Sequence, residues 1–238
     1  MLDRIDALST YVHRPEVATS LIFRTTADGR SDLIALGPRS RGLYSVGQTV
    51  RLCVRARLRP GRARELLGIS PAEIVDRAVP LTDLWGARAR QMADDWAGAG
   101  RARLLFHLSE MSAGGGGSGV PLLDAAMREL TGPAARLTEV AARLGVSERH
   151  LRHLFAREIG LSPKHVARIQ RVRRVLALAG RREWAAVAGD AGFFDQAHMI
   201  SDFRSMMGVA PGAFLAGRLP AATPCGPGYR TSTKIGFE

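Results

Sequence analysis

Alternating apolar and polar residues predict β-strands in the first quarter of the chain. Between residues 49 and 58 every second residue is apolar, and the residues between them are three arginines and a cysteine. This spacing is typical of a strand that packs one face against a core and turns the other to water. The runs 20–26 and 32–36 also have strand character, and the turn signals Asp28-Gly29 and Gly37-Pro38 separate the runs.

A helical pattern follows these strands, near residues 61–68, 71–77 and 81–109. Ser70-Pro71 has the residue types of a helix cap followed by a first helical residue. We therefore expect residues 1–112 to form an N-terminal mixed β/α domain.

The stretch 113–120 marks the clearest boundary, because its run of glycines has too few side chains to hold one conformation. It predicts a flexible linker, and a tight glycine loop inside one domain is the alternative. Residues 121–219 then show short helices and no strand, and the tail 220–238 is rich in Pro, Gly and Thr and is predicted to be poorly ordered. The expected fold class is α+β overall, with an all-α C-terminal domain over 121–219.

Two helices with a short turn are predicted within residues 137–163. Thr138 has the residue type to cap the first helix, and Gly145 allows a left-handed turn after it. Ser147 has the residue type to cap the second helix, whose apolar residues fall on one face. This order of elements is a helix-turn-helix unit.

The same unit recurs at residues 184–211. Gly192 lies 47 residues after Gly145, and Asp195 lies 48 residues after Ser147, because the second turn has gained one residue. The offset then stays at 48 as far as the Gly-x-x-Pro that ends each unit. A chance match would not keep register from the turn to the final proline.

A long connecting helix is predicted between the two units, over residues 163–180. An apolar stripe runs along it, and no acidic residue stands between 164 and 182. Such a basic run is either a solvated face or a set of phosphate contacts. The basic residues are Lys164, Arg168, Arg171, Arg173, Arg174, Arg181 and Arg182.

The net charge of +12 agrees with a polyanionic partner such as nucleic acid, although a genome rich in G and C would also raise the arginine content. The two cysteines stand far apart without a CxxC motif, so neither a disulfide framework nor a cysteine zinc site is expected. No P-loop, GxSxG or paired metal motif is present. The N-terminus lacks a signal peptide and no run is long enough to cross a membrane, so we expect a cytoplasmic protein, associated with the nucleoid.

Residues 122–218 resemble the C-terminal DNA-binding domain of AraC/XylS-type transcription regulators. The resemblance rests on the paired units, the connecting helix and the stretch AGFFDQAHMISDFRSMMGVAP. The N-terminal half resembles, more faintly, a sensor domain that precedes this DNA-binding domain in some regulators. The resemblance implies sequence-specific DNA binding, with the second helix of each unit in successive major grooves.

The family's DNA-contacting positions fall on the second helix of each unit. Arginines in the first unit suit guanine, whereas glutamine and alanine in the second suit adenine and a thymine methyl group. Ser201 and Asp202 stand where more positive charge was expected, which predicts a weaker second unit. The full expected set is Arg149, Arg152 and His153 in the first unit, Gln196, Ala197, His198 and Ser201 in the second, and Lys164, Arg173 and Arg174 on the connecting helix.

The resemblance implies double-stranded DNA, RNA polymerase, a small-molecule effector and a second copy of the chain as partners, with no cofactor, no metal and no membrane. Two alternatives stay open. One is a DNA-repair or other enzyme with an attached helix-turn-helix domain, which would want reactive or zinc-binding cysteines. The other is an architectural or protein-binding module that uses these units for packing.

Overall fold

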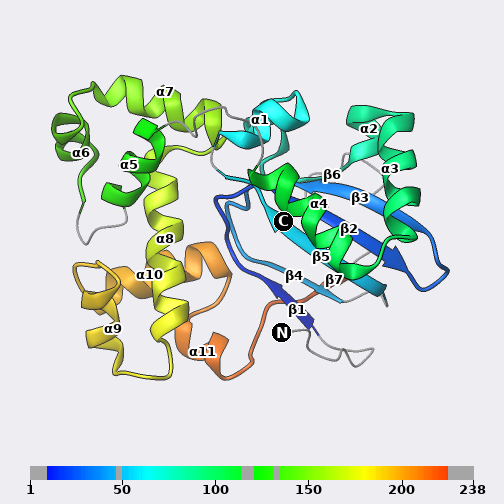
Figure 1. Ribbon diagram of the computed structural model, residues 1–238. Helices are drawn as coiled ribbons and strands as arrows, with labels where there is room; N and C mark the ends of the chain where they lie inside the picture. Colours follow the sequence, from blue (N-terminus) through cyan, green and yellow to red (C-terminus); the bar gives the residue numbers. More distant parts are fainter. Residues whose placement is uncertain (1–9, 47–49, 60, 114–120, 131–134, 225–238) are drawn as a thin grey trace.

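The computed structural model describes residues 10–46, 50–59, 61–113, 121–130 and 135–224. We call residues 10–113 the N-terminal region and residues 121–219 the C-terminal region. Figure 1 shows the strands and their covering helices gathered in the first region and a bundle of helices in the second. The expected α+β class, with a mixed β/α part followed by a helical part, is confirmed.

A four-stranded antiparallel sheet organises the N-terminal region. Its order is β5-β2-β3-β6, where the strands are β2 (Ser20–Thr26), β3 (Ser31–Leu36), β5 (Val50–Arg57) and β6 (Ala78–Pro80). Phe23 lies opposite Leu33 on one neighbouring strand and Val54 on the other, so apolar residues meet in a row across one face. The predicted alternation along β5 is confirmed, because its arginines and Cys53 are exposed.

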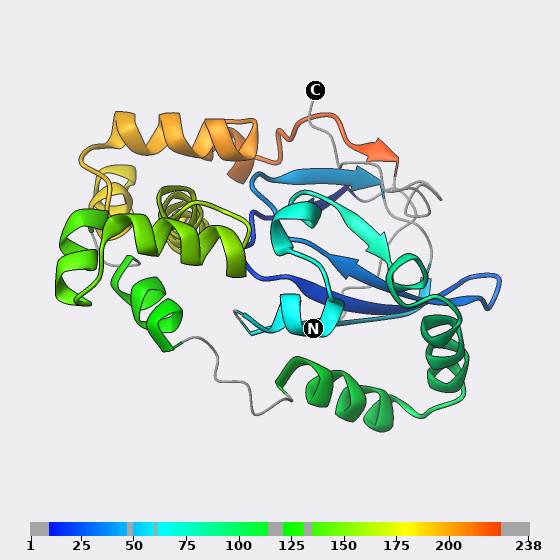
Figure 2. The same ribbon diagram turned by 90° about the horizontal axis from the view of Figure 1, so that it is seen from above.

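Helices cover the apolar face of this sheet (Figures 1 and 2). Trp96 packs edge-on against Phe23, with 6.1 Å between the ring centroids. The predicted cap is confirmed, because the Ser70 hydroxyl accepts from the Ala72 amide. The covering elements are α1 (Arg62–Leu67), the 3-10 turn η1 (Pro71–Ile74), α2 (Leu81–Trp85), α3 (Ala87–Ala97) and α4 (Arg101–Ala113).

The helical stretch expected over 81–109 is confirmed, and it is divided among three helices. Gly86 has φ 60° and ψ −136°, which no helical residue adopts, so α2 ends there and α3 leaves in a new direction. Residues 98–100 then separate α3 from α4.

A second, three-stranded sheet joins the two ends of the described chain. β1 (Thr10–His13) pairs with β4 (Leu43–Val46), and β7 (Thr223–Pro224) pairs with β4 in parallel. Thr223 and Pro224, within the tail predicted to be poorly ordered, therefore form a short strand, which corrects that expectation for these residues and also the expectation of no strand after the linker. The rest of the tail, and the predicted linker apart from Ala113 at the end of α4, lie outside the described residues.

The C-terminal region packs around one long helix, α8 (Pro163–Leu178). Its Val166, Ile169, Val172 and Val175 are almost completely buried, as the predicted apolar stripe requires. The surrounding helices are α5 (Pro121–Leu130), α6 (Leu137–Arg143), α7 (Glu148–Glu158), α9 (Trp184–Asp190), α10 (Gln196–Met207) and α11 (Pro211–Leu215). No helix in the described part of the chain is long and apolar enough to cross a membrane.

Polar contacts hold the two regions together. Glu16, only 5% exposed, pairs with Arg57 of β5 at 2.8 Å and with Arg173 of α8 at 2.6 Å. Burial by itself raises the pKa of Glu16, but the hydrogen bond and charge of Arg173 and the charge of Arg57 outweigh it and lower that pKa. The Tyr44 hydroxyl donates to the Met207 carbonyl oxygen at 2.7 Å.

A double-mutant cycle measures how strongly this acid ties the regions. For Glu16→Ala and Arg173→Ala in the full chain, urea unfolding should give a coupling energy of roughly 1–3 kcal/mol, because the pair is shielded from water. The matched control is the exposed pair Glu129–Arg143, for which less than about 1 kcal/mol is expected. Equal coupling in the two pairs would contradict a structural role for Glu16.

Candidate DNA-binding surface

The first helix-turn-helix unit consists of α6 and α7. Gly145 has φ 67°, and the Val146 amide behind it donates to the Ala141 carbonyl oxygen at 3.0 Å. The Ser147 hydroxyl accepts from the His150 amide and so caps α7, as predicted. The predicted cap at Thr138 is wrong: α6 begins one residue earlier, after Arg136, and the Thr138 hydroxyl donates to Glu148 instead.

The second unit, α9 and α10, repeats this geometry bond by bond. Gly192 has φ 84°, and the Phe193 amide donates to the Ala188 carbonyl oxygen at 2.9 Å, 47 residues after the matching bond in the first unit. The Asp195 carboxylate accepts from the His198 amide at 2.7 Å and caps α10. The repeat inferred from the sequence is therefore present in the backbone hydrogen bonds.

Of the second helices of the two units, α7 lies near the start of α8 and α10 crosses the middle of α8, and the two run in similar directions (Figures 1 and 2). Each is held to the N-terminal region at its C-terminal end. Gly160, just after α7, approaches η1 so closely that a Cβ there would lie 2.6 Å from the Ala72 nitrogen. At the end of α10, the Met206 carbonyl oxygen accepts from the Gly42 amide at 2.7 Å. The N-terminal ends of both helices consequently point away from the sheets.

The predicted DNA-contacting side chains of α7 are exposed. Arg149 and His153 make no ion pair within the part of the chain that the structure describes. Arg152 pairs with Glu148, one turn earlier, at 2.5 Å. Arg149 is therefore ready to meet a new partner, whereas Arg152 must exchange or share Glu148.

The predicted side chains of α10 are also exposed. Gln196, Ala197 and Ser201 lie on the outer surface of its first two turns. The His198 ring stands edge-on against the buried Phe193 ring, with 5.3 Å between centroids, so it also supports the turn. Ile200, next to Ser201, is partly buried against the core.

A family model described as a helix-turn-helix domain matches residues 140–217, which contain both units and α8. Residues 140–217 are an AraC-type helix-turn-helix domain. The model leaves residues 1–139 and 218–238 unmatched.

Several solved structures are also similar to this chain. The C-terminal domain of AraT, a response regulator from Geobacillus stearothermophilus, is 21% identical, with 42% of this chain and 85% of that chain covered and a TM-score of 0.38. The DNA-binding domain of AdpA, a global transcriptional factor in complex with a target DNA, is 25% identical, with 41% and 88% covered and a TM-score of 0.37. ToxT from Vibrio cholerae, bound to an unsaturated fatty acid, is 12% identical, with 90% and 94% covered and a TM-score of 0.43. No curated protein matched the chain.

Asp202 corrects one expectation about the second helix-turn-helix unit. Its carboxylate faces α8, where it pairs with Arg168 at 2.9 Å and Arg171 at 3.2 Å. Burial by itself raises the pKa of Asp202, but the hydrogen bonds and charges of these two arginines outweigh it and lower that pKa. Asp202 therefore fixes α10 on α8 and adds no negative charge to the outer surface, so only Ser201 still argues for a weaker second unit.

The connecting helix corrects a second expectation. Arg173 was expected to contact phosphate, but Glu16 of the N-terminal region holds its guanidinium at 2.6 Å. Arg168 and Arg171 are engaged by Asp202, and Arg182 pairs with Asp190. Lys164 is exposed and Arg174 is half-buried. Most of the basic residues between 164 and 182 therefore form ion pairs within the protein.

Phe194 is a surface residue that the sequence analysis did not select. It is the residue by which the second turn exceeds the first, and 93% of its surface is exposed. Its neighbour Phe193 is buried, with the Arg171 guanidinium 5.1 Å from its ring centroid. The turn is therefore held in place while Phe194 projects beside the start of α10. The extra residue in the second turn was the sequence signal that pointed to it.

Cys53 does not have the environment of a reactive cysteine. Cys53 is exposed on β5, yet partial burial of its sulfur raises the pKa of the thiol despite the charges of Arg24 and Arg55. A raised pKa disfavours the thiolate that a reactive cysteine needs. Among the described residues, no group of three His, Cys, Asp or Glu side chains could hold a metal ion.

The ion pairs of Asp202 predict a pH-dependent contribution to stability. Asp202→Ala should lower the free energy of unfolding by roughly 1.5–3 kcal/mol at pH 7, because two half-buried guanidinium groups lose their acceptor. The difference from the parent protein should shrink as the pH falls below about 4, where the carboxylate is protonated first in the unfolded chain. Urea unfolding from pH 7 to pH 3 measures it.

The matched control for this prediction is Asp190→Ala at the end of α9, which breaks an exposed pair with Arg182 in the loop before that helix. It should cost less than about 1 kcal/mol. If both variants lose equal stability, Asp202 does not fix α10 in the way the contacts indicate.

Proposed function

We propose that the regulator binds sequence-specifically to double-stranded DNA by placing the N-terminal halves of α7 and α10 in successive major grooves on one face of the duplex. The observation that carries this proposal is the orientation of the two helices. Both are held at their C-terminal ends by the N-terminal region, and both present exposed polar side chains at the opposite end. The start of a recognition helix is the part that contacts base edges.

The first unit supplies the basic side chains in this proposal. Arg149 and Arg152 have the planar donor fork that fits the O6 and N7 atoms of guanine, and His153 lies beside them. The backbone amides at the start of α7 and α10, next to the caps Ser147 and Asp195, can donate hydrogen bonds to phosphate oxygens.

The second unit supplies a different set. Gln196 can bond to adenine N6 and N7, Ala197 can contact a thymine methyl group, and Ser201 can bond to either base type. His198 contributes from the edge of this set. Lys164 and Arg174 on α8 contact phosphates, and Arg173 leaves the set because it holds Glu16.

Phe194 joins the second unit in this proposal. A phenylalanine ring can lie against a thymine methyl group or wedge against a base step. Its position before the cap Asp195 puts it at the same end of α10 as Gln196 and Ala197.

The remaining partners follow from the architecture. We assign residues 1–112 to a regulatory domain, 113–120 to the linker and 121–219 to the DNA-binding domain. A small-molecule effector, a second copy of the chain and RNA polymerase are the further partners, and the cytoplasm with its nucleoid is the site of action. Contacts of the N-terminal region with the ends of α7 and α10 support a regulatory role.

The base-specific role of Arg149 is tested by selecting binding sites from random duplex DNA. Arg149→Ala should weaken binding to the selected site by about 1–3 kcal/mol and relax the preference at one position, because a base-specific contact is lost. Arg157→Ala, at the far end of α7 and paired with Glu158, should leave the preference unchanged. A parent protein with no sequence preference would instead favour the architectural alternative.

Phe194→Ala is expected to weaken binding to the selected site by about tenfold and to reduce the preference for thymine next to the contacts of α10, because the contact of the ring with the base is lost. The unfolding free energy should stay the same, since the side chain is 93% exposed. Leu215→Ala, another exposed apolar residue, is the control. Undiminished binding by Phe194→Ala would remove Phe194 from the interface.

A further inference from the structure

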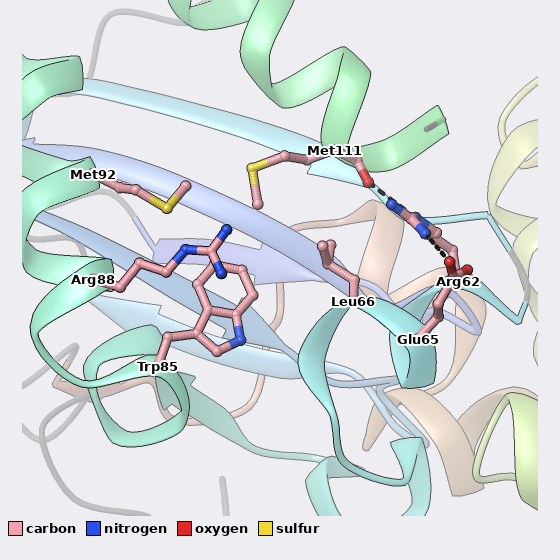
Figure 3. A pocket seen from close by; sticks show the side chains of 7 residues that line it. All are labelled: Arg62, Glu65, Leu66, Trp85, Arg88, Met92 and Met111. Carbon is pink, nitrogen blue, oxygen red and sulfur yellow. Dashed lines mark hydrogen bonds and ion pairs between the residues drawn. The ribbon is translucent and has the colours of Figure 1, made fainter. Parts of the chain in front are cut away.

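A pocket in the N-terminal region lies between the helices that cover the four-stranded sheet. None of its lining residues belongs to a helix-turn-helix unit. It has a volume of about 330 Å³ and is lined by Arg62, Glu65, Leu66, Trp85, Arg88, Met92 and Met111. Figure 3 shows α1 on one side, the end of α2 and the start of α3 on the other, and Met111 of α4 between them. This volume lies at the lower end of the range for small-molecule sites, about 300–1,000 Å³.

Much of the pocket wall is apolar, and one side of it is flat. The Trp85 indole forms that side, and Leu66, Met92 and Met111 supply flexible aliphatic and thioether surface. All four side chains are only partly buried, so the pocket leaves apolar surface uncovered within the described chain. Methionine side chains adapt to the shape of an occupant and make favourable contacts with aromatic rings.

The charged side chains around the pocket suit a ligand with a single negative charge. Arg62 is already engaged, because it pairs with Glu65 at 2.7 Å and donates to the Met111 carbonyl oxygen at 3.4 Å. Arg88 has no ion-pair partner among the described residues, and its side chain extends from α3 into the pocket that Trp85 also lines (Figure 3). One free guanidinium fork matches a single carboxylate, whereas Glu65 on the opposite wall disfavours a more highly charged group.

We propose that this pocket binds a small aromatic carboxylate, with its ring against Trp85 and the methionines and its carboxylate on Arg88. The site is also connected to the first recognition helix. Leu66 belongs to α1, and α1 and η1 both pack against α7, where Gly160 meets the backbone of Ala72. An occupant that moves α1 would therefore shift α7. This coupling rests on the DNA-binding role proposed for α7.

Calorimetric titration of the full chain with naphthylacetate tests the site. Naphthylacetate should bind saturably, and its neutral counterpart naphthylacetamide should bind about tenfold more weakly, because it lacks the charge for Arg88. Arg88→Gln should reduce naphthylacetate affinity by the same factor. Arg90→Gln, an exposed arginine on the same helix, should leave it unchanged.

Trp85→Phe locates the ligand, because quenching of tryptophan fluorescence by naphthylacetate should largely disappear while binding remains measurable by calorimetry. Failure of naphthylacetate to bind overturns the proposal, and so does equal binding by Arg88→Gln and the parent protein. Quenching that survives in Trp85→Phe overturns the location.

The coupling to α7 is tested by measuring affinity for the selected DNA site with and without saturating naphthylacetate. A change in DNA affinity that is lost in Arg88→Gln supports it, and the same factor should separate naphthylacetate affinities with and without DNA. Unchanged DNA affinity overturns the coupling. Since DNA binding is measured first without ligand, failure of the DNA-binding proposal is seen separately from failure of the pocket.

Discussion

The buried apolar stripe of α8 is the constraint on which the C-terminal region depends. Val166, Ile169, Val172 and Val175 lose nearly all their exposure, and the core around them draws residues from both helix-turn-helix units. Burial of four such side chains is worth several kcal/mol, which is enough to fix the two units relative to each other. One rigid helix therefore sets the separation between two DNA-binding surfaces.

The polar side of the same helix fixes what lies around it. Glu16 reaches α8 from the N-terminal region and Asp202 reaches it from α10, and each carboxylate takes two arginines. A buried carboxylate is stable only when its charge is matched in this way. The arginines of α8 thus act mainly inside the protein, whereas Arg149 of α7 keeps its charge exposed and without an ion pair among the described residues.

The N-terminal region contacts both α7 and α10 at their C-terminal ends. Gly160 and the backbone of Ala72 meet without room for a side chain, while Gly42 and Tyr44 bind carbonyl oxygens at the end of α10. Because these contacts involve backbone atoms and close packing, small movements of the N-terminal region cannot be absorbed by side chains alone. Through these contacts, a movement of the helices around the pocket (α1, α2, α3 and α4) would be transmitted to α7.

The sequence by itself determined the elements whose causes are local. Glycines with positive φ at Gly145 and Gly192, the caps Ser147 and Asp195, the stripe of α8 and the alternation of β5 all follow from residues a few positions apart. The exposed set on α7 and α10 could be predicted for the same reason, because residues off an apolar stripe face outward. Only the tertiary structure decided the partners of charges: Glu16 and Arg173 stand 157 residues apart, so no local pattern assigns one to the other. It also decided that Thr223 and Pro224 form a strand, since a two-residue strand exists only where β4 offers its edge, and that Asp202 faces α8 instead of DNA.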